Sequence, residues 1–103
     1  MSQTPIVAAN FIDVEPDRQQ ELVEFVQEAA DTIFVKLPGF KAATILASPD
    51  GTKVVSVGLW ESMEAVEAVR GNPEVAAYVP RLAEIGTSNV SLFRQVSTHS
   101  GDS

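Results

Sequence analysis

The segment from residue 37 to residue 62 constrains the fold most, because it has the pattern of a single β-hairpin. Two short, mostly apolar runs, residues 41–47 and 54–60, flank the sequence Ser-Pro-Asp-Gly-Thr at positions 48–52. Proline presets φ for a turn, and Asp-Gly supplies residues that accept a positive φ. We therefore predict two antiparallel neighbouring strands joined by this turn.

Helices are predicted on both sides of the hairpin. Pro38-Gly39 is a typical helix stop before it, and Ser62 after it is a good N-cap. The helix that follows is interrupted, because Gly71-Asn72-Pro73 separates a piece over residues 63–70 from a piece over residues 74–85. The pattern predicts two helical pieces joined by a turn.

The chain before the hairpin has the pattern of a strand followed by a helix. Ile6–Val14 is predicted to be a strand, apolar on both faces at its start, which is typical of a strand covered on both sides. Asp17 with Gln20 fits a capping box at the start of the helix. The apolar face of this helix recurs every three or four residues, at Leu22, Val26, Ala29, Ile33 and Leu37.

A last strand is predicted over residues 88–96, so the element order is β-α-β-β-α-β. This order predicts an α+β, ferredoxin-like fold, in which a four-stranded antiparallel sheet carries helices on one face. We expect residues 1–96 to form a single domain and residues 97–103 to form a polar tail. Residues 54–60 are apolar or small on both faces, and the helices cover only one. We therefore expect a second copy to cover the other face in a homodimer.

Composition excludes several classes of function. The chain has 14 acidic and 7 basic residues, a net charge of −7 that would repel a phosphate backbone, so no nucleic-acid partner is expected. There is no cysteine, and the single histidine, His99, lies in the polar tail, so we expect no metal site within one chain. No signal peptide and no membrane span are expected, which makes a cytoplasmic location the default. The acidic face of the first helix is interpreted as solvated surface: Glu21, Glu24, Glu28 and Asp31.

The best indication of a pocket lies on the second hairpin strand. Ser56, Gly58 and Trp60 share one face of it, because side chains alternate along a strand. Glycine within a strand often marks the close approach of a ligand or of another backbone. This face therefore either lines a ligand pocket or packs Trp60 at a strand-to-helix corner.

Three further residues are candidates for ligand contacts. Asn10 either hydrogen-bonds a substrate oxygen or satisfies a neighbouring backbone group. Tyr78 either donates to a ligand or acts as an acid–base group, or it is a core residue whose hydroxyl reaches water. Arg81, one helical turn on, either holds a phenolate or carboxylate or lies on the surface. No strong general base is evident, because Asp13 and Glu61 lie at strand ends.

Three pieces of sequence resemble one known family over about residues 6–96. They are Leu37-Pro38-Gly39-Phe40, the Ser-Pro-Asp-Gly turn, and the valine-rich strand that ends in Trp60-Glu61-Ser62 with Ala65 close behind. Together they resemble the antibiotic biosynthesis monooxygenase (ABM) domain family. The resemblance implies a dimeric α/β barrel made from two ferredoxin-like subunits.

Within that family the chain is most similar to cofactor-free monooxygenases of aromatic polyketides. These use O₂ to oxidise an anthrone or a similar phenolic tricycle to a quinone, so the resemblance implies an aromatic substrate, O₂ and no cofactor. Trp60 matches the tryptophan that lines their pocket. Their asparagine four residues earlier is Ser56 here, and a tyrosine early in their second helix is Val66. An arginine later in that helix is matched to Arg81.

Other activities stay open under the same resemblance. A second subgroup degrades haem with a strand asparagine, a helix tryptophan and a histidine ligand. Asn10 stands at the first of these positions, Val69 at the second, and Tyr78 or Val79 at the third. The remaining alternatives are a non-catalytic small-molecule-binding barrel and an isomerase or cyclase that needs no O₂.

Overall fold

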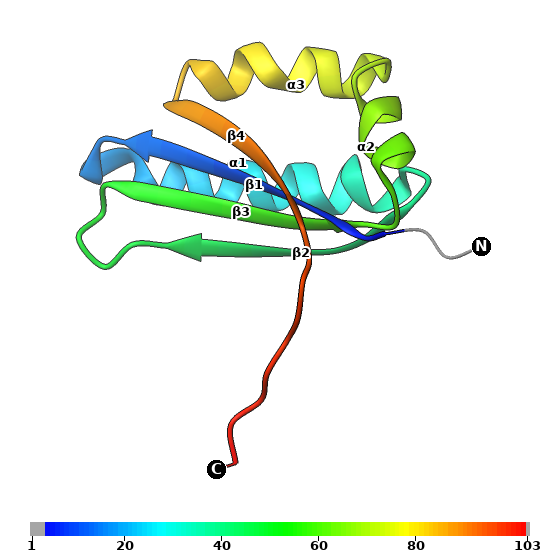
Figure 1. Ribbon diagram of the computed structural model, residues 1–103. Coiled ribbons are helices and arrows are strands. Elements are labelled where there is room, and N and C mark those ends of the chain that lie inside the picture. The colour runs from blue at the N-terminus through cyan, green and yellow to red at the C-terminus, as the bar shows by residue number, and fades with distance from the viewer. Residues whose placement is uncertain (1–3, 103) are drawn as a thin grey trace.

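The computed structural model describes residues 4–102, which form a four-stranded antiparallel sheet with helices on one face (Figure 1). The strand order is β2-β3-β1-β4, and each neighbouring pair is antiparallel. This confirms the predicted α+β, ferredoxin-like fold. In chain order the elements are β1 (Ile6–Val14), the 3-10 turn η1 (Pro16–Arg18), α1 (Gln19–Thr32), the 3-10 turn η2 (Phe34–Lys36), β2 (Phe40–Ala47), β3 (Lys53–Trp60), α2 (Met63–Val69), α3 (Pro73–Ala83) and β4 (Gly86–Arg94).

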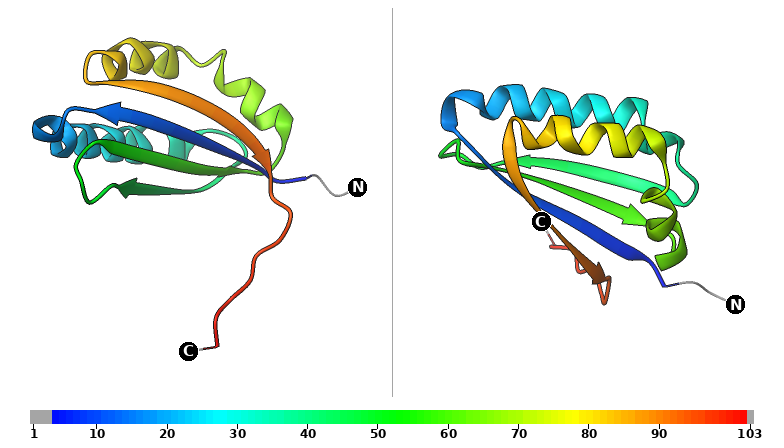
Figure 2. Two further views of the ribbon diagram at one scale, coloured as in Figure 1. Left: turned by 60° about the vertical axis from the view of Figure 1, so that its left-hand side comes forward. Right: turned by 90° about the horizontal axis from the view of Figure 1, so that it is seen from above.

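The helices form a layer over one side of the sheet. Figure 2 shows α1 and α3 side by side above the strands, with the shorter α2 at the end where β3 leaves the sheet. After β4 the chain extends away from this body without regular structure as far as residue 102 (Figure 1). Within residues 4–102, no helix combines the length and apolar character that spanning a bilayer requires.

The hairpin of β2 and β3 forms as predicted. Asp50 closes its turn, because its carboxylate accepts a hydrogen bond from the Thr52 backbone N–H at 3.0 Å and from the Ser48 and Thr52 hydroxyls at 2.8 Å. These hydrogen bonds, that of the Thr52 backbone first, lower the pKa of Asp50 to about 2. Gly51 follows with φ +83°, as the Asp-Gly signal requires.

The predicted capping box at the start of the first helix is wrong. Asp17 lies in η1, and α1 begins at Gln19 without a side-chain cap. Pro16 occupies the first position of η1, where its fixed φ suits a tight turn, so a separate 3-10 turn precedes the α-helix. Gln20 instead donates to the Glu24 carboxylate one turn on, at 3.0 Å.

The first helix also ends earlier than its apolar periodicity suggests. It stops at Thr32, and η2 leads into an extended Leu37, so Leu37 does not continue the helical face. Gly39, with φ +83°, then turns the chain into β2. A Cβ on Gly39 would lie 2.5 Å from the Cβ of Ala65, so this glycine also lets α2 approach the hairpin.

The interrupted second helix is confirmed as α2 and α3. The Ser62 hydroxyl accepts from the Ala65 N–H at 3.2 Å and caps α2. The Asn72 side chain accepts from the first N–H groups of α3, with Pro73 as its first residue. The last strand, β4, begins and ends two residues earlier than predicted, at Gly86 and Arg94.

The main core occupies one half of the space between sheet and helices. Ile12 and Val54 pair across β1 and β3, and each is at most 1% exposed. The core cluster consists of Ile12, Val14, Leu22, Val26, Val54 and Leu82. The opposite face of the sheet is apolar too, and in residues 4–102 no helix covers it (Figure 2). Its large side chains Phe11, Leu46 and Phe93 are about half exposed.

Candidate functional site

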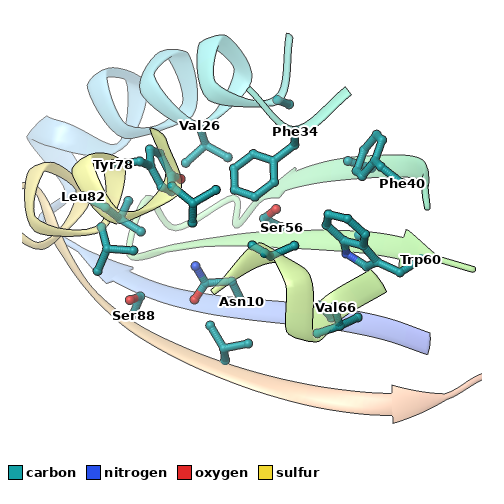
Figure 3. A pocket seen from close by; sticks show the side chains of 18 of the residues that line it. Asn10, Val26, Phe34, Phe40, Ser56, Trp60, Val66, Tyr78, Leu82 and Ser88 are labelled. Carbon is teal, nitrogen blue, oxygen red and sulfur yellow. The ribbon is translucent and has the colours of Figure 1, made fainter. Parts of the chain in front are cut away.

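A cavity of about 610 Å³ lies between the helix-facing side of the sheet and the three helices (Figure 3). All four strands contribute to its floor, and α1, α2 and α3 contribute to its walls and roof. Its size falls within the roughly 300–1,000 Å³ of ordinary small-molecule sites. The cavity adjoins the core, because Val26 and Leu82 belong to both.

The floor is hollow because one row across three strands carries the smallest side chains. Ala43 of β2 pairs with Gly58 of β3, and Gly58 pairs with Ala8 of β1. The three lie side by side on the helix-facing surface, and all line the cavity. We call these three residues the small row. A valine or leucine at any of them would occupy the space that is now open.

Trp60 forms one end wall, next to the small row. It is 4% exposed and makes edge-to-face contacts with Phe40 and Phe34, at centroid distances of 5.2 and 6.5 Å. A Cβ on Gly58 would come within 3.2 Å of the Trp60 Nε1. Gly58 therefore both deepens the floor and gives the indole room to lie over the strand.

A polar row bounds the small row on its other side. Asn10 and Ser56 are paired directly across β1 and β3 and face the cavity (Figure 3). The Asn10 Oδ1 is buried and has no hydrogen-bond partner within residues 4–102. Asn10 therefore does not satisfy a neighbouring backbone group through this oxygen, which leaves the amide free for a ligand.

Tyr78 hangs from α3 over the same space (Figure 3). Its ring stacks on Phe25 at 5.1 Å and meets the edge of Phe34 at 5.7 Å. Burial raises the pKa of Tyr78 to about 12, so the phenol is neutral at physiological pH and acts as a hydrogen-bond donor. Neither Tyr78 nor Ser56 takes part in the side-chain hydrogen bonds found in residues 4–102.

The structure brings six of the seven candidate residues to this cavity. They are Asn10, Ser56, Gly58, Trp60, Val66 and Tyr78. Arg81 is the exception: it is exposed, and its guanidinium lies 5.3 Å from the centre of the Phe25 ring, beside a small crevice between α1 and α3. Arg81 therefore lies over Phe25 beside this crevice and does not line the cavity.

Several lining residues were missed by sequence reasoning. Phe34 lies next to Ile33 of the predicted apolar face, and Phe40 belongs to the Pro-Gly-Phe motif that leads into β2, so both had signals. Ser88 and Arg70 also line the cavity. Arg70 had a weaker signal, because it lies four residues after Val66 on the same helical face.

The lining is mostly apolar, with a few neutral polar groups and, within residues 4–102, one charged side chain, Arg70. In the described part of the chain, the lining includes no Asp, Glu, His or Lys side chain. Residues 4–102 also contain no group of three or more His, Cys, Asp or Glu side chains placed to hold a metal ion. The arrangement offers hydrogen-bond donors to a ligand oxygen and flat aromatic surfaces to a ligand ring.

Comparison with known proteins identifies the family. The sequence profile described as antibiotic biosynthesis monooxygenase (ABM) matches residues 5–81. The chain belongs to this family. The ABM resemblance seen in the sequence motifs is thereby confirmed.

Two similar proteins with named monooxygenase activity come from Streptomyces. A tetracenomycin-F1 monooxygenase of Streptomyces glaucescens is 30% identical over 66 residues, which make up 64% of this chain and 59% of that protein. The match thus spans less than two thirds of that relative. A monooxygenase from the ActVA-Orf6 gene of Streptomyces coelicolor, solved in complex with nanaomycin D, is 27% identical, with a TM-score of 0.86 over 96% of this chain and 94% of that one.

A second solved structure is similar in fold. SnoaB, a cofactor-independent oxygenase from Streptomyces nogalater, has a TM-score of 0.77 over 92% of this chain and 96% of its own, at 23% identity. The chain therefore shares the fold of its subunit with these two solved structures.

Proposed function

We propose that this chain is a cofactor-independent monooxygenase that uses O₂ to oxidise aromatic, enolisable small molecules of the polyketide or quinone-precursor type. One observation carries the proposal. Asn10, Ser56 and Tyr78 converge, without partners of their own, on an apolar cavity that Trp60 closes at one end. The named activities of the relatives support the same reaction class.

The cavity suits a flat, oxygenated ring system. The small row gives a floor on which a ring can lie, and Trp60 and Phe34 supply aromatic side walls. An oxygen on the ring reaches the Asn10 amide and the hydroxyls of Ser56 and Tyr78. A buried donor set of this kind rejects analogues that lack the oxygen, because the donors would then stay unpaired.

The first step is loss of a proton from the substrate. No carboxylate or imidazole lines the cavity in the described chain, so the substrate's own acidity drives this step and water accepts the proton. The Asn10 amide and the Ser56 and Tyr78 hydroxyls stabilise the developing enolate by donating to its oxygen. Tyr78 serves here as a donor, because its phenol is protonated at physiological pH.

Reaction with O₂ follows. The enolate passes one electron to O₂, and the resulting substrate radical and superoxide combine at the ring carbon to give a peroxide. The peroxide takes back from water the proton lost in the first step. The carbon then loses its remaining proton as the O–O bond breaks, and this proton joins the departing hydroxide, which forms the carbonyl and releases water. One oxygen atom enters the product and the other leaves as water. The protein contributes orientation and exclusion of solvent.

Oxygen uptake with the anthrone dithranol tests the function. We expect uptake above that of boiled protein, and a loss of about tenfold in Trp60→Phe, because a smaller ring lets the substrate shift from its reactive pose. Val35→Ala, at an exposed position outside the cavity, is the control and should keep the wild-type rate. Folded protein that consumes no O₂, or a Trp60→Phe variant as fast as wild type, would overturn the proposal.

A second candidate function is ligand binding or isomerisation without O₂. It is favoured by Ser56 and Val66, which offer less to a substrate oxygen than the asparagine and tyrosine that the ABM resemblance places there. Product formation under anaerobic conditions indicates an isomerase or cyclase. Quenching of Trp60 fluorescence by ligands that are never turned over indicates a binding protein.

Haem degradation has less support from the geometry. Val69 and Val79 line the cavity at positions where that subgroup would place larger functional groups. Tyr78 is the lining residue best able to ligate iron, but its pKa of about 12 disfavours the phenolate that binds the metal.

The homodimer belongs to this proposal as well. Phe11, Leu46 and Phe93 stand about half exposed on the helix-free face of the sheet, and a second copy would bury them. We expect light scattering at micromolar protein to give twice the chain mass of 11.0 kDa. We expect Phe11→Lys to give the monomer mass, because it places a charge in the interface. A monomeric wild type would contradict the dimer.

A further inference from the structure

The cavity lining contains a single charged side chain in the described part of the chain, Arg70. It directly follows the last residue of α2. Val66 and Val69 line the cavity from the same helix, and spacings of three and four residues place all three on one helical face. Arg70 therefore extends an otherwise apolar helical face toward the cavity.

Arg70 belongs to the open side of the cavity. It is exposed, as are other large lining side chains, namely Val79 of α3 at 54% and Val90 and Leu92 of β4 at 57% and 39%. Asn10 and Ser56, by contrast, lie on the floor, on the two central strands. A ligand that reaches the floor groups still presents its outer end to solvent on this side.

The guanidinium of Arg70 has no partner of its own in residues 4–102. Ion pairs there join Arg18 to Glu21 and Lys53 to Asp13, and the side-chain hydrogen bonds do not involve Arg70. Glu67 and Glu74 lie three residues before and four residues after it, yet neither forms an ion pair with it. The favourable end of the α2 dipole accounts for a cation at this position, but not for its place in the cavity lining.

We infer that Arg70 selects substrates with a carboxylate, which it binds at the cavity opening while the ring system lies over the small row. A guanidinium matches a carboxylate in geometry and charge. The chain carries a net charge of −7, so an anionic substituent needs a local cation to approach this surface. The inference takes the aromatic substrate from the proposed function, but it needs no turnover.

Binding of two matched probes tests it under conditions in which no oxidation occurs. The probes are an anthraquinone carboxylate and the corresponding neutral carboxamide, titrated against the fluorescence of Trp60, the single tryptophan of the chain. We expect wild type to bind the carboxylate about fivefold more tightly, a preference that shrinks with added salt because the site is exposed. Arg70→Gln should lose the preference, and Arg70→Lys should retain part of it.

Arg94→Gln is the matched control, since it removes the same charge from an exposed arginine that does not line the cavity. It should keep the wild-type preference, which excludes an effect of net charge alone. Equal binding of the two probes by wild type, an unchanged preference in Arg70→Gln, or no binding of either probe would overturn the inference. The oxygen-uptake assay with neutral dithranol is independent of these outcomes, so a failure here is distinguishable from a failure of the proposed monooxygenase activity.

Discussion

The helix-facing side of the sheet has two halves that share the same strands but differ in what they hold. In one half, Ile12 and Val54 pair across β1 and β3, and α1 covers them with the fully buried Leu22. In the other half, the same two strands pair Ala8 with Gly58, and the space above stays open. The backbone pairing is continuous between them. The cavity is therefore a product of side-chain volume, set by a few small residues in register.

Asn10 and Ser56 mark the border between the two halves. They pair across the same strands, between the core row and the small row. A buried acceptor without a partner, such as the Asn10 Oδ1, costs about 1–3 kcal/mol. The cavity half thus contributes less to the stability of the fold than the core half does. This is expected of a site whose residues are suited to binding a ligand.

Truncation in the core half should have the largest effect. We expect Leu22→Ala to lower the free energy of unfolding by about 3 kcal/mol, because Leu22 is fully buried and its loss leaves a void among Ile12, Val54 and Leu82. The matched change in the cavity half, Leu92→Ala, should cost about 1 kcal/mol, because Leu92 already borders open space. Denaturant unfolding of both variants measures the difference. Equal losses would show that the two halves are packed alike.

A smaller change in the free energy of unfolding, of opposite sign, is expected at Asn10, on the border between the two halves. Asn10→Leu should raise the free energy of unfolding by about 1 kcal/mol, because it removes the unpaired acceptor and adds apolar contact. The same change should reduce oxygen uptake, since it removes a donor to the substrate oxygen and narrows the cavity. Stability and uptake are measured on the same preparations.

Asn89→Leu is the control for that change. Asn89 is exposed on β4, on the opposite face of the sheet, where it pairs with Phe11. The Asn89→Leu variant should leave oxygen uptake unaltered. If Asn10→Leu destabilised the protein, the amide would be making a structural contribution, and the interpretation of Asn10 as a ligand donor would be wrong.

Local signals in the sequence were enough to predict the fold. The Asp50-Gly51 turn, the Ser62 cap and the break at Asn72-Pro73 each depend on residues close together in the chain, and all three are confirmed. The start of α1 was mispredicted because Pro16 favours a separate 3-10 turn, which competes with a capping box at Asp17. The correct predictions and the incorrect one thus all depend on residues that are close together in the chain.

The sequence could predict which site residues share a face of one strand, but not which residues of different strands lie side by side. Alternation along β3 places Ser56, Gly58 and Trp60 on one face. The small row, however, also needs Ala8 and Ala43, and their alignment depends on the register of three strands and on the bulge between Phe40 and Ala42. The prediction that Arg81 lies at the cavity was wrong, because its position depends on how α3 packs against α1. Arg81 lies three residues after Tyr78 on α3, but its guanidinium lies over the Phe25 ring and does not line the cavity.

The smallest expected effect on the free energy of unfolding comes from the titration of Tyr78, and it appears only above pH 10. Tyr78 is the single tyrosine of the chain, and it packs where the roof of the cavity meets α1. Its folded-state pKa of about 12 exceeds the unfolded value of about 10. Between these values the unfolded chain has lost the proton and the folded chain has kept it. The contribution of Tyr78 to stability is therefore complete below pH 10 and falls as the pH rises through the folded-state pKa. Absorbance of the tyrosinate, followed while Trp60 fluorescence reports the folded state, measures the titration.

Phe25→Ala should lower the pKa of Tyr78 toward 10, because it exposes the ring that Phe25 covers, whereas Val35→Ala should leave this pKa unaltered. A wild-type pKa near 10 in folded protein would mean that water reaches the phenol freely, and the donor role of Tyr78 in a dry cavity would then lose its support.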